Sequence, residues 1–199
     1  QNGIFNHSET ELISSMNGGL PVDGRDPIFV VGATLNGACP ADCFNCPFGQ
    51  SVWKARRLRA IPVNVSQMIN YLGQAREISI AEGALRFGQR FGVRGFGAGD
   101  PGYYTFLPDI MEAVSQFEGC VSSSWSSIAP AMNHTNILRA MEAGATRVME
   151  TNPGHKLRLY FSLHDTRHRD RVEYTGEDVM PLEEIGQAVP ILAKIIGCR

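Results

Sequence analysis

Two patterns of apolar and polar positions alternate along the chain, and they predict strands and helices in turn. Residues 28–33 form a short apolar run bounded by turn-forming residues, which is typical of a buried strand. Apolar residues then recur every three or four positions, which predicts a helix over residues 65–75 behind a cap at Asn64 or Ser66, with a second helical stretch toward Phe87. The same patterns predict, in order, strand 93–97, helix 107–117, strand 120–125, helix 136–145, strand 146–150, strand 156–164 and helix 181–196.

This alternation predicts an α/β fold, because helices between successive strands are the connections that build a parallel sheet from right-handed units. Four or five such units are too few for a closed eight-stranded barrel, which typically takes about 250 residues. We therefore expect a partial (β/α) barrel, open or truncated, with flanking helices. A polar N-terminal segment at residues 1–26 precedes this core at residues 27–199, and Pro190 is expected to kink or interrupt the last helix.

Composition supports a single globular core and excludes some classes of protein. The 199 residues are 43% hydrophobic and 19% charged, which is sufficient to bury one sizeable core. The net charge of −2 gives no overall attraction to nucleic acid or to an anionic membrane. No apolar run approaches the roughly 20 residues of a membrane span, and the chain opens without a hydrophobic secretory segment. These features predict a cytoplasmic protein with no membrane partner.

Three of the five cysteines are clustered in the stretch CPADCFNC, directly after the first predicted strand. Structural zinc normally needs four ligands, and Cys120, the next thiol, begins a strand and is expected to be a buried core residue. Three thiolates at Cys39, Cys43 and Cys46 suit three irons of a [4Fe-4S] cluster and leave the fourth iron open to another ligand. An iron–sulfur cluster is therefore the preferred interpretation, with zinc or no metal as alternatives.

The other unusual motifs also follow predicted strands. GAGDP at residues 97–101 follows the second strand, a serine run at residues 122–127 follows the third, and Ser162 and His164 follow the fourth. Carboxyl ends of parallel strands meet at one edge, so these groups are expected to line a common site. Each of these motifs could instead have a purely structural role, since Gly-rich and Ser-rich strand ends often form only turns or backbone caps.

In combination, these motifs resemble the radical S-adenosylmethionine (radical SAM) superfamily, whose cluster loop has the cysteine spacing of CPADCFNC. Among its branches, the chain is most similar to the dual-specificity RNA methyltransferases that methylate adenine, in which GMGEP-like, STSG-VVP-like and SLHA segments recur in this order. Here the corresponding segments are GAGDP, SWSSIAP and SLHD. The matched stretch runs from Cys39 to Asp165, which is about two-thirds of the chain.

The resemblance implies that residues 27–199 form a radical SAM core. Such a core binds a [4Fe-4S] cluster and S-adenosyl-L-methionine (SAM), and it cleaves SAM reductively to a 5′-deoxyadenosyl radical. An external electron donor such as flavodoxin or ferredoxin is then expected. RNA adenine methylation is the leading specific reaction. Radical chemistry on a small molecule or peptide is the second hypothesis, and a noncatalytic metal-binding α/β protein is the alternative from a different class.

Transferred residue by residue, the resemblance also assigns roles around SAM. Gly99 and Asp100 would bind its methionine moiety, which is reasonable because a carboxylate suits an ammonium group. The residues that would line the ribose and adenine side are Ser124, Ser162, Leu163 and His164.

Two basic stretches follow these motifs in the sequence, residues 54–59 after the cysteine cluster and residues 167–171 after SLHD. They are expected either to attract the phosphates of an RNA partner or to form solvated surface, because acidic residues are interspersed among them. The run HDTRHRD, at residues 164–170, is predicted to be an exposed loop rather than a metal site, in spite of its two histidines.

Overall fold

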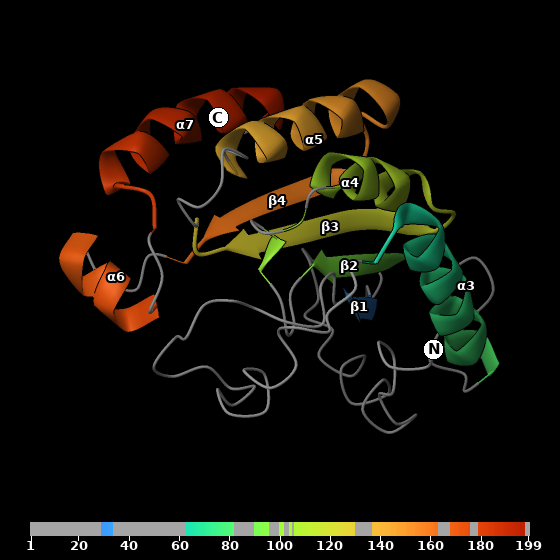
Figure 1. Cartoon of the computed structure of the whole chain (residues 1–199). Coiled ribbons are helices and arrows are strands. Elements are labelled where there is room, and N and C mark those ends of the chain that lie inside the picture. The colour runs from blue at the N-terminus through green and yellow to red at the C-terminus, as the bar shows by residue number, and fades with distance from the viewer. Residues whose placement is uncertain are drawn as a thin grey trace.

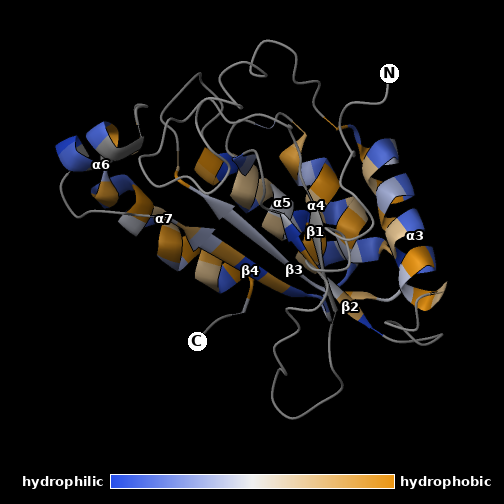
Figure 2. Cartoon of the chain, turned by 90° about the horizontal axis from the view of Figure 1, so that it is seen from below, coloured by the Kyte–Doolittle hydropathy of each residue, from blue (hydrophilic) through white to orange (hydrophobic). Residues whose placement is uncertain are grey.

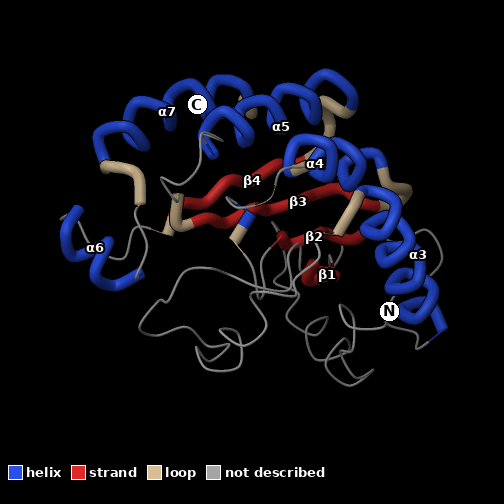
Figure 3. Tube along the Cα trace, in the orientation of Figure 1, coloured by secondary structure: helices blue, strands red, loops and turns tan. Residues whose placement is uncertain are grey.

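The computed structural model describes residues 29–33, 63–81, 90–95, 100–101, 104, 106–129, 137–162, 168–175 and 179–197. For residues 29–33, 168, 171 and 174–175 only the backbone is described. Strands and helices alternate along this part of the chain, as the sequence predicts (Figures 1 and 3). In chain order the elements are β1 (Phe29–Ala33), α3 (Val65–Ala81), β2 (Phe91–Gly95), α4 (Leu107–Gln116), β3 (Cys120–Ser127), α5 (Ile137–Thr151), β4 (Lys156–Phe161), α6 (His168–Thr175) and α7 (Leu182–Ile195).

The four strands form one parallel sheet in the order β1-β2-β3-β4. Each strand therefore pairs with the next one in the chain, so the connections all step across the sheet in the same direction. Right-handed crossovers in one direction place their helices on the same side of the sheet. Helices α3, α4, α5 and α7 accordingly lie on one face, and α6 lies beyond the carboxyl ends of β3 and β4 (Figures 1 and 3). The expected α/β class, with parallel strands and flanking helices, is confirmed, and the described sheet is open.

Helix α3 begins with a reciprocal capping arrangement. The Gln67 N–H donates to Asn64 Oδ1, and the Asn64 N–H donates to Gln67 Oε1, both at 2.9 Å. These bonds satisfy backbone donors that the first turn of a helix leaves without partners. The predicted cap at Asn64 is confirmed, and the helix continues past the predicted residues 65–75 as far as Ala81.

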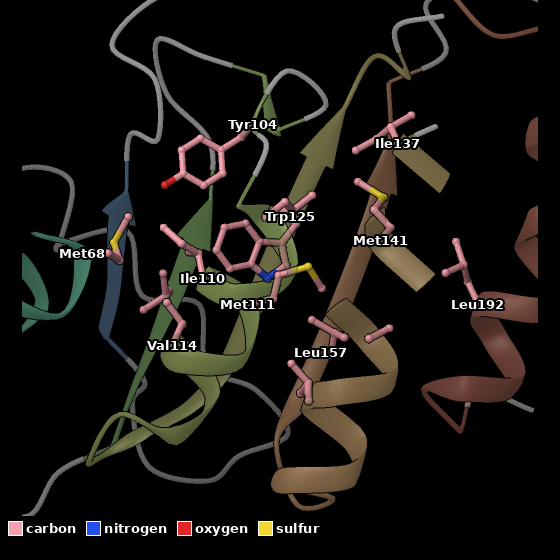
Figure 4. Packing of buried hydrophobic residues seen from close by; sticks show 14 of the residues in the cluster. Met68, Tyr104, Ile110, Met111, Val114, Trp125, Ile137, Met141, Leu157 and Leu192 are labelled. Carbon is pink, nitrogen blue, oxygen red and sulfur yellow. The ribbon is translucent and has the colours of Figure 1, made fainter. Parts of the chain in front are cut away.

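The hydrophobic core lies between the sheet and the helices (Figure 4). Helices α3, α4, α5 and α7 each contribute one apolar face, in the spacing that the sequence pattern indicates. On the sheet, alternate residues point to this side, and Trp125 at the centre of β3 is completely buried. The residues of the core drawn and labelled in Figure 4 are Met68, Tyr104, Ile110, Met111, Val114, Trp125, Ile137, Met141, Leu157 and Leu192.

The predicted strand at residues 146–150 is wrong, because these residues form the end of helix α5. Its buried face continues at helical spacing through Met141, Ala145 and Val148. Packing of this face against α4 and the sheet outweighs the weak strand propensity of the segment TRVME. The predicted helix 136–145 is thus too short, and α5 spans Ile137–Thr151.

Two further expectations near the end of the chain need correction. The run predicted to be a loop contains helix α6, which begins at His168. In α7, the chain stays helical through Pro190, so the expected interruption is wrong, while the alternative of a kink stays a prediction. Pro190 itself is exposed, while Ile185 and Leu192 on the same helix are buried, so packing holds the helix on both sides of the proline.

Candidate functional site at the carboxyl ends of the strands

Of the nine residues that the sequence assigns to the cluster and to SAM, three belong to the part of the chain that the structure describes: Asp100, Ser124 and Ser162. The roles given to the others stay predictions, because those residues lie outside the described ranges. They are Cys39, Cys43, Cys46, Gly99, Leu163 and His164.

Asp100 follows β2 and is bound to the end of the neighbouring strand, β3. Its Oδ1 atom accepts a hydrogen bond of 2.6 Å from the Ser127 hydroxyl, and its Oδ2 atom accepts one of 2.7 Å from the Ile128 N–H. The carboxylate is also buried, with 8% of the residue exposed. Bonds from donors to a buried carboxylate are stronger than bonds between neutral groups. Asp100 therefore joins the carboxyl ends of β2 and β3.

Ser127, the last residue of β3, is the centre of this arrangement. Its hydroxyl donates to Asp100 and accepts a 2.9 Å hydrogen bond from the Ala129 N–H. Its carbonyl accepts a 2.8 Å bond from the Ser162 N–H, directly after β4. The Ala129 carbonyl in turn accepts a 2.8 Å bond from the N–H of Met180, just before α7. Segments that follow β2, β3 and β4 thus meet at one point, as the sequence predicts for its strand-end motifs.

The backbone at Ala129 is in the left-handed region, with φ of 54°. A residue with a side chain rarely adopts this conformation, which costs of order 1 kcal/mol or more. Both backbone polar groups of Ala129 are hydrogen-bonded, to Ser127 and Met180, and its side chain is completely buried. These contacts hold the strained turn that ends β3.

The hydroxyls of Ser124 and Ser162 are placed by two different elements. Ser124 lies within β3, as does the whole serine run at residues 122–127, so the expectation that this run follows the strand is wrong. Ser126, two positions later and on the same face, has its Oγ 3.3 Å from the Ser162 Oγ. Hydroxyls of β3 and of the segment after β4 therefore share one face of the sheet near its carboxyl edge.

Ser127 and the Ile128 N–H are the partners that sequence reasoning did not assign to Asp100. Ser127 belongs to the SWSSIAP segment, which the sequence places after a strand, but nothing in the sequence indicates which hydroxyl meets the carboxylate. As a chemical arrangement, Asp100 with Ser127 has no imidazole bound to the serine among the described residues. The pair can bind and orient a polar ligand, and the described residues provide no imidazole base that would make Ser127 a nucleophile.

A serine and a histidine do meet elsewhere, in the core. The Ser123 Oγ lies 2.8 Å from His155 Nε2 and accepts a 3.2 Å hydrogen bond from the Trp125 indole N–H. Burial lowers the pKa of His155 to about 4, and hydrogen bonding with the Cys120 backbone partly opposes this shift. His155 directly precedes β4, at the amino end of the strands, and only 4% of it is exposed. This neutral, buried pair stabilises the core and is not placed to reach a substrate.

Cys120 has the role that the sequence predicts, a buried thiol in the core. Burial raises its pKa to about 12, so it is protonated at neutral pH and is a poor metal ligand. Within the described ranges, no group of three or more histidine, cysteine or acidic side chains is arranged to hold a metal ion. No helix in that part of the chain is long and apolar enough to cross a membrane.

Comparisons with known proteins add no relative to these observations. No family model matches the chain, and no curated protein and no solved structure matches it either.

Proposed function

We propose that the chain is a radical SAM enzyme that binds a [4Fe-4S] cluster through Cys39, Cys43 and Cys46. The proposal rests on the spacing of these cysteines and on the meeting of two other family-like segments. GAGDP contributes Asp100 and the segment SLHD contributes Ser162, and both are hydrogen-bonded to Ser127 at the end of β3. The hydrogen bonds of both segments to Ser127 are the main support for the proposal, because the two segments are far apart in the sequence.

The sheet is compatible with the partial barrel that the proposal requires. Parallel strands in consecutive order, with the crossover helices on one face, are the arrangement of one section of a (β/α) barrel. A doubly wound sheet would instead reverse its strand order and carry helices on both faces. β1 is parallel to β2, so β1 ends at the same edge of the sheet as the strands that precede Asp100 and Ser162. Cys39, Cys43 and Cys46 follow this end of β1 in the sequence.

The polar groups at this edge fit the polar groups of SAM. Hydroxyls such as those of Ser124 and Ser162 can bond to a ribose, and a carboxylate such as that of Asp100 can accept from an ammonium group. Ser127 and the Ile128 N–H each donate to one oxygen of Asp100, and a carboxylate oxygen can accept more than one bond. When bound, the cluster and SAM would supply the reductive cleavage that yields a 5′-deoxyadenosyl radical.

RNA adenine methylation is the specific reaction we propose, with flavodoxin or ferredoxin as the electron donor. The order of the motifs supports it, and methylated adenine in RNA treated with the reconstituted enzyme would demonstrate it. SAM cleavage without RNA methylation would favour the small-molecule or peptide alternative. An intact cluster that never cleaves SAM would favour a noncatalytic metal-binding protein.

Anaerobic reconstitution with iron and sulfide tests the central claim. The reconstituted protein should contain about four irons per chain, and with a reductant and SAM it should form 5′-deoxyadenosine. Replacing Cys39, Cys43 or Cys46 with alanine should abolish the stable cluster. Cys120→Ala is the matched control, because this thiol is buried in the core, and it should keep the cluster. A cluster that needs Cys120, or one whose electron paramagnetic resonance spectrum never responds to SAM, would contradict the proposal.

A further inference from the structure

Tyr104 lies between β2 and α4, four positions after Asp100. Two hydrogen bonds hold its backbone. The Tyr104 N–H donates to the Pro101 carbonyl at 3.0 Å, and the Tyr104 carbonyl accepts from the Leu107 N–H at 3.3 Å. Asp100, at the start of this segment, is itself bonded to the end of β3. The ring of Tyr104 is therefore held in a defined place at the carboxyl edge of the sheet.

The hydroxyl of Tyr104 is buried without a partner. Only 2% of the residue is exposed, and its Oη atom has no hydrogen bond to any residue that the structure describes. Most buried polar atoms in proteins are hydrogen-bonded, because a group that loses its water without gaining a bond costs free energy. A phenylalanine would fill the same space without this cost. The hydroxyl is therefore placed to contact a group that the folded chain binds.

This hydroxyl is directed toward the β1 side of the carboxyl edge. Figure 4 shows the oxygen pointing away from Trp125 and toward the blue ribbon of β1. β1 and β2 are parallel neighbours, so both end at this edge. Helices α3 and α4 lie beside these two strands in Figure 1 and also in Figure 2, which views the sheet from below. Met68 of α3 and Ile110 of α4 belong to the same core cluster as the ring, so apolar side chains surround it.

The position of the hydroxyl distinguishes between the two groups proposed to bind at this edge. Cys39 comes six positions after Ala33, the last residue of β1, so a cluster bound by it is expected on the β1 side. Asp100 and Ser162, which are expected to contact SAM, are instead bonded to Ser127 at the end of β3. The hydroxyl is thus directed to the side of the cluster.

The chemistry of the hydroxyl also suits the cluster. Burial, and secondarily the charge of Asp109, raises the pKa of Tyr104 to about 12, so the hydroxyl keeps its proton at neutral pH. It can therefore donate a hydrogen bond. Cysteine thiolates and the inorganic sulfides of an iron–sulfur cluster carry negative charge and no proton, so they can only accept.

We propose that the Tyr104 hydroxyl donates a hydrogen bond to a sulfur atom of the cluster and thereby raises its reduction potential. The inference rests on the proposed function, because it requires the cluster. Hydrogen bonds to the sulfurs stabilise the reduced cluster more than the oxidised one, since reduction adds a negative charge. Tyr104 then favours the uptake of the electron that SAM cleavage requires.

A redox titration of the reconstituted full chain, followed by electron paramagnetic resonance and without SAM, tests this inference. Tyr104→Phe should keep about four irons per chain. It should lower the potential by about 60 mV, which corresponds to a tenfold shift in a one-electron equilibrium. Fluorotyrosine in place of Tyr104 keeps the ring and is a stronger donor, so it should raise the potential. If Tyr104→Phe fails to hold iron, the direction of the shift in the fluorotyrosine protein decides the question.

Tyr160→Phe is the matched control. It removes an exposed hydroxyl from β4, at the opposite end of the four-stranded sheet from β1, and should leave the potential unchanged. A wild-type chain that assembles no cluster would overturn the proposed function and this inference with it. A cluster whose potential is the same in the wild type and in both Tyr104 variants would overturn the inference alone. A shift that appears only after SAM is added would place the hydroxyl on SAM, which also contradicts it.

Discussion

The indole ring of Trp125 occupies the space that a side chain at Gly95 would need. A Cβ atom built on Gly95 would lie less than 3.0 Å from three carbon atoms of that ring. Trp125 is completely buried, and its indole N–H donates to the Ser123 hydroxyl, so the ring has little freedom to move away. The close approach of β2 and β3 beneath α4 thus depends on a residue without a side chain at the end of β2.

Gly95→Ala should therefore destabilise the protein by about 2 to 3 kcal/mol, because the new methyl group forces a shift in a close-packed core. Chemical denaturation followed by circular dichroism would measure the loss. Gly73→Ala is the control, since no atom lies within 4 Å of a Cβ at that position and the residue is inside helix α3. The control should be neutral or more stable by up to about 1 kcal/mol. Equal stability of the Gly95→Ala variant and the wild type would show that Trp125 can move freely.

Asp100→Ala should cost about 2 to 3 kcal/mol of unfolding free energy, because it leaves the Ser127 hydroxyl and the Ile128 N–H without their buried acceptor. Glu118→Ala offers a comparison, since this carboxylate is exposed and lies 3.5 Å from Arg76. An exposed pair of this kind contributes about 1 kcal/mol at most. Thermal unfolding of both variants would compare the two costs, and similar losses would mean that Asp100 does not join the strands.

In the reconstituted protein, Asp100→Ala is also expected to weaken SAM binding and leave cluster assembly intact.

His155 should make the stability depend on pH. Its pKa is about 4 in the folded protein, against an ordinary value of 6.5, because burial disfavours the charged ring. As the pH falls, the histidine takes up a proton in the unfolded chain before it does so in the folded protein. The stability that the neutral ring contributes is therefore fully present above pH 6.5 and is lost as the pH falls toward 4. The full loss is about 3 kcal/mol, from 1.4 kcal/mol for each pKa unit.

Urea denaturation of the wild type and of His155→Gln between pH 7 and pH 4 would isolate this effect. Titration of the acidic residues is common to both proteins, so the difference between the two curves reports His155. The variant is expected to start less stable and to lose less stability on acidification. Parallel curves for the two proteins would show that His155 does not carry the pH dependence.

Tyr104→Phe should leave the stability unchanged or raise it by up to about 1 kcal/mol. Only 2% of Tyr104 is exposed, and its hydroxyl has no hydrogen-bond partner among the residues that the structure describes. Burial, and secondarily the charge of Asp109, raises the pKa of Tyr104 to about 12, so the hydroxyl stays protonated. Tyr104→Ala, which also removes the ring, should cost about 3 to 5 kcal/mol. A marked loss in Tyr104→Phe, measured by thermal unfolding, would reveal a hydrogen bond from this hydroxyl.

The sequence alone determines much of the order of elements, because helix and strand periods are local properties. The sequence pattern by itself predicts the apolar run of β1, the helical spacing of α3 and α4, and the capping residue Asn64. Burial of Cys120 is predictable in the same way, since an apolar strand surrounds it. The cysteine spacing of CPADCFNC is likewise a local pattern, and it carries a hypothesis about cofactors that the described residues do not test.

Local patterns fail where packing decides between alternatives. The segment TRVME has residues that favour a strand, but the buried stripe of α5 continues through it, so the helix extends to Thr151. Helix α6 has little apolar character of its own, so its sequence reads as a loop although the chain is helical from His168. In α5, packing against α4 and the sheet outweighs the weak strand preference of the segment TRVME.

Only the tertiary structure decides which side chains of the site meet. Asp100 and Ser127 are 27 positions apart, and their hydrogen bond depends on the register of β2 against β3. The approach of the Ser126 and Ser162 hydroxyls depends in the same way on the register of β3 against β4, because a shift of one residue would turn a strand's side chains to the other face. Strand pairing is a contact between segments that are distant in sequence, so the residues of one strand alone do not specify it.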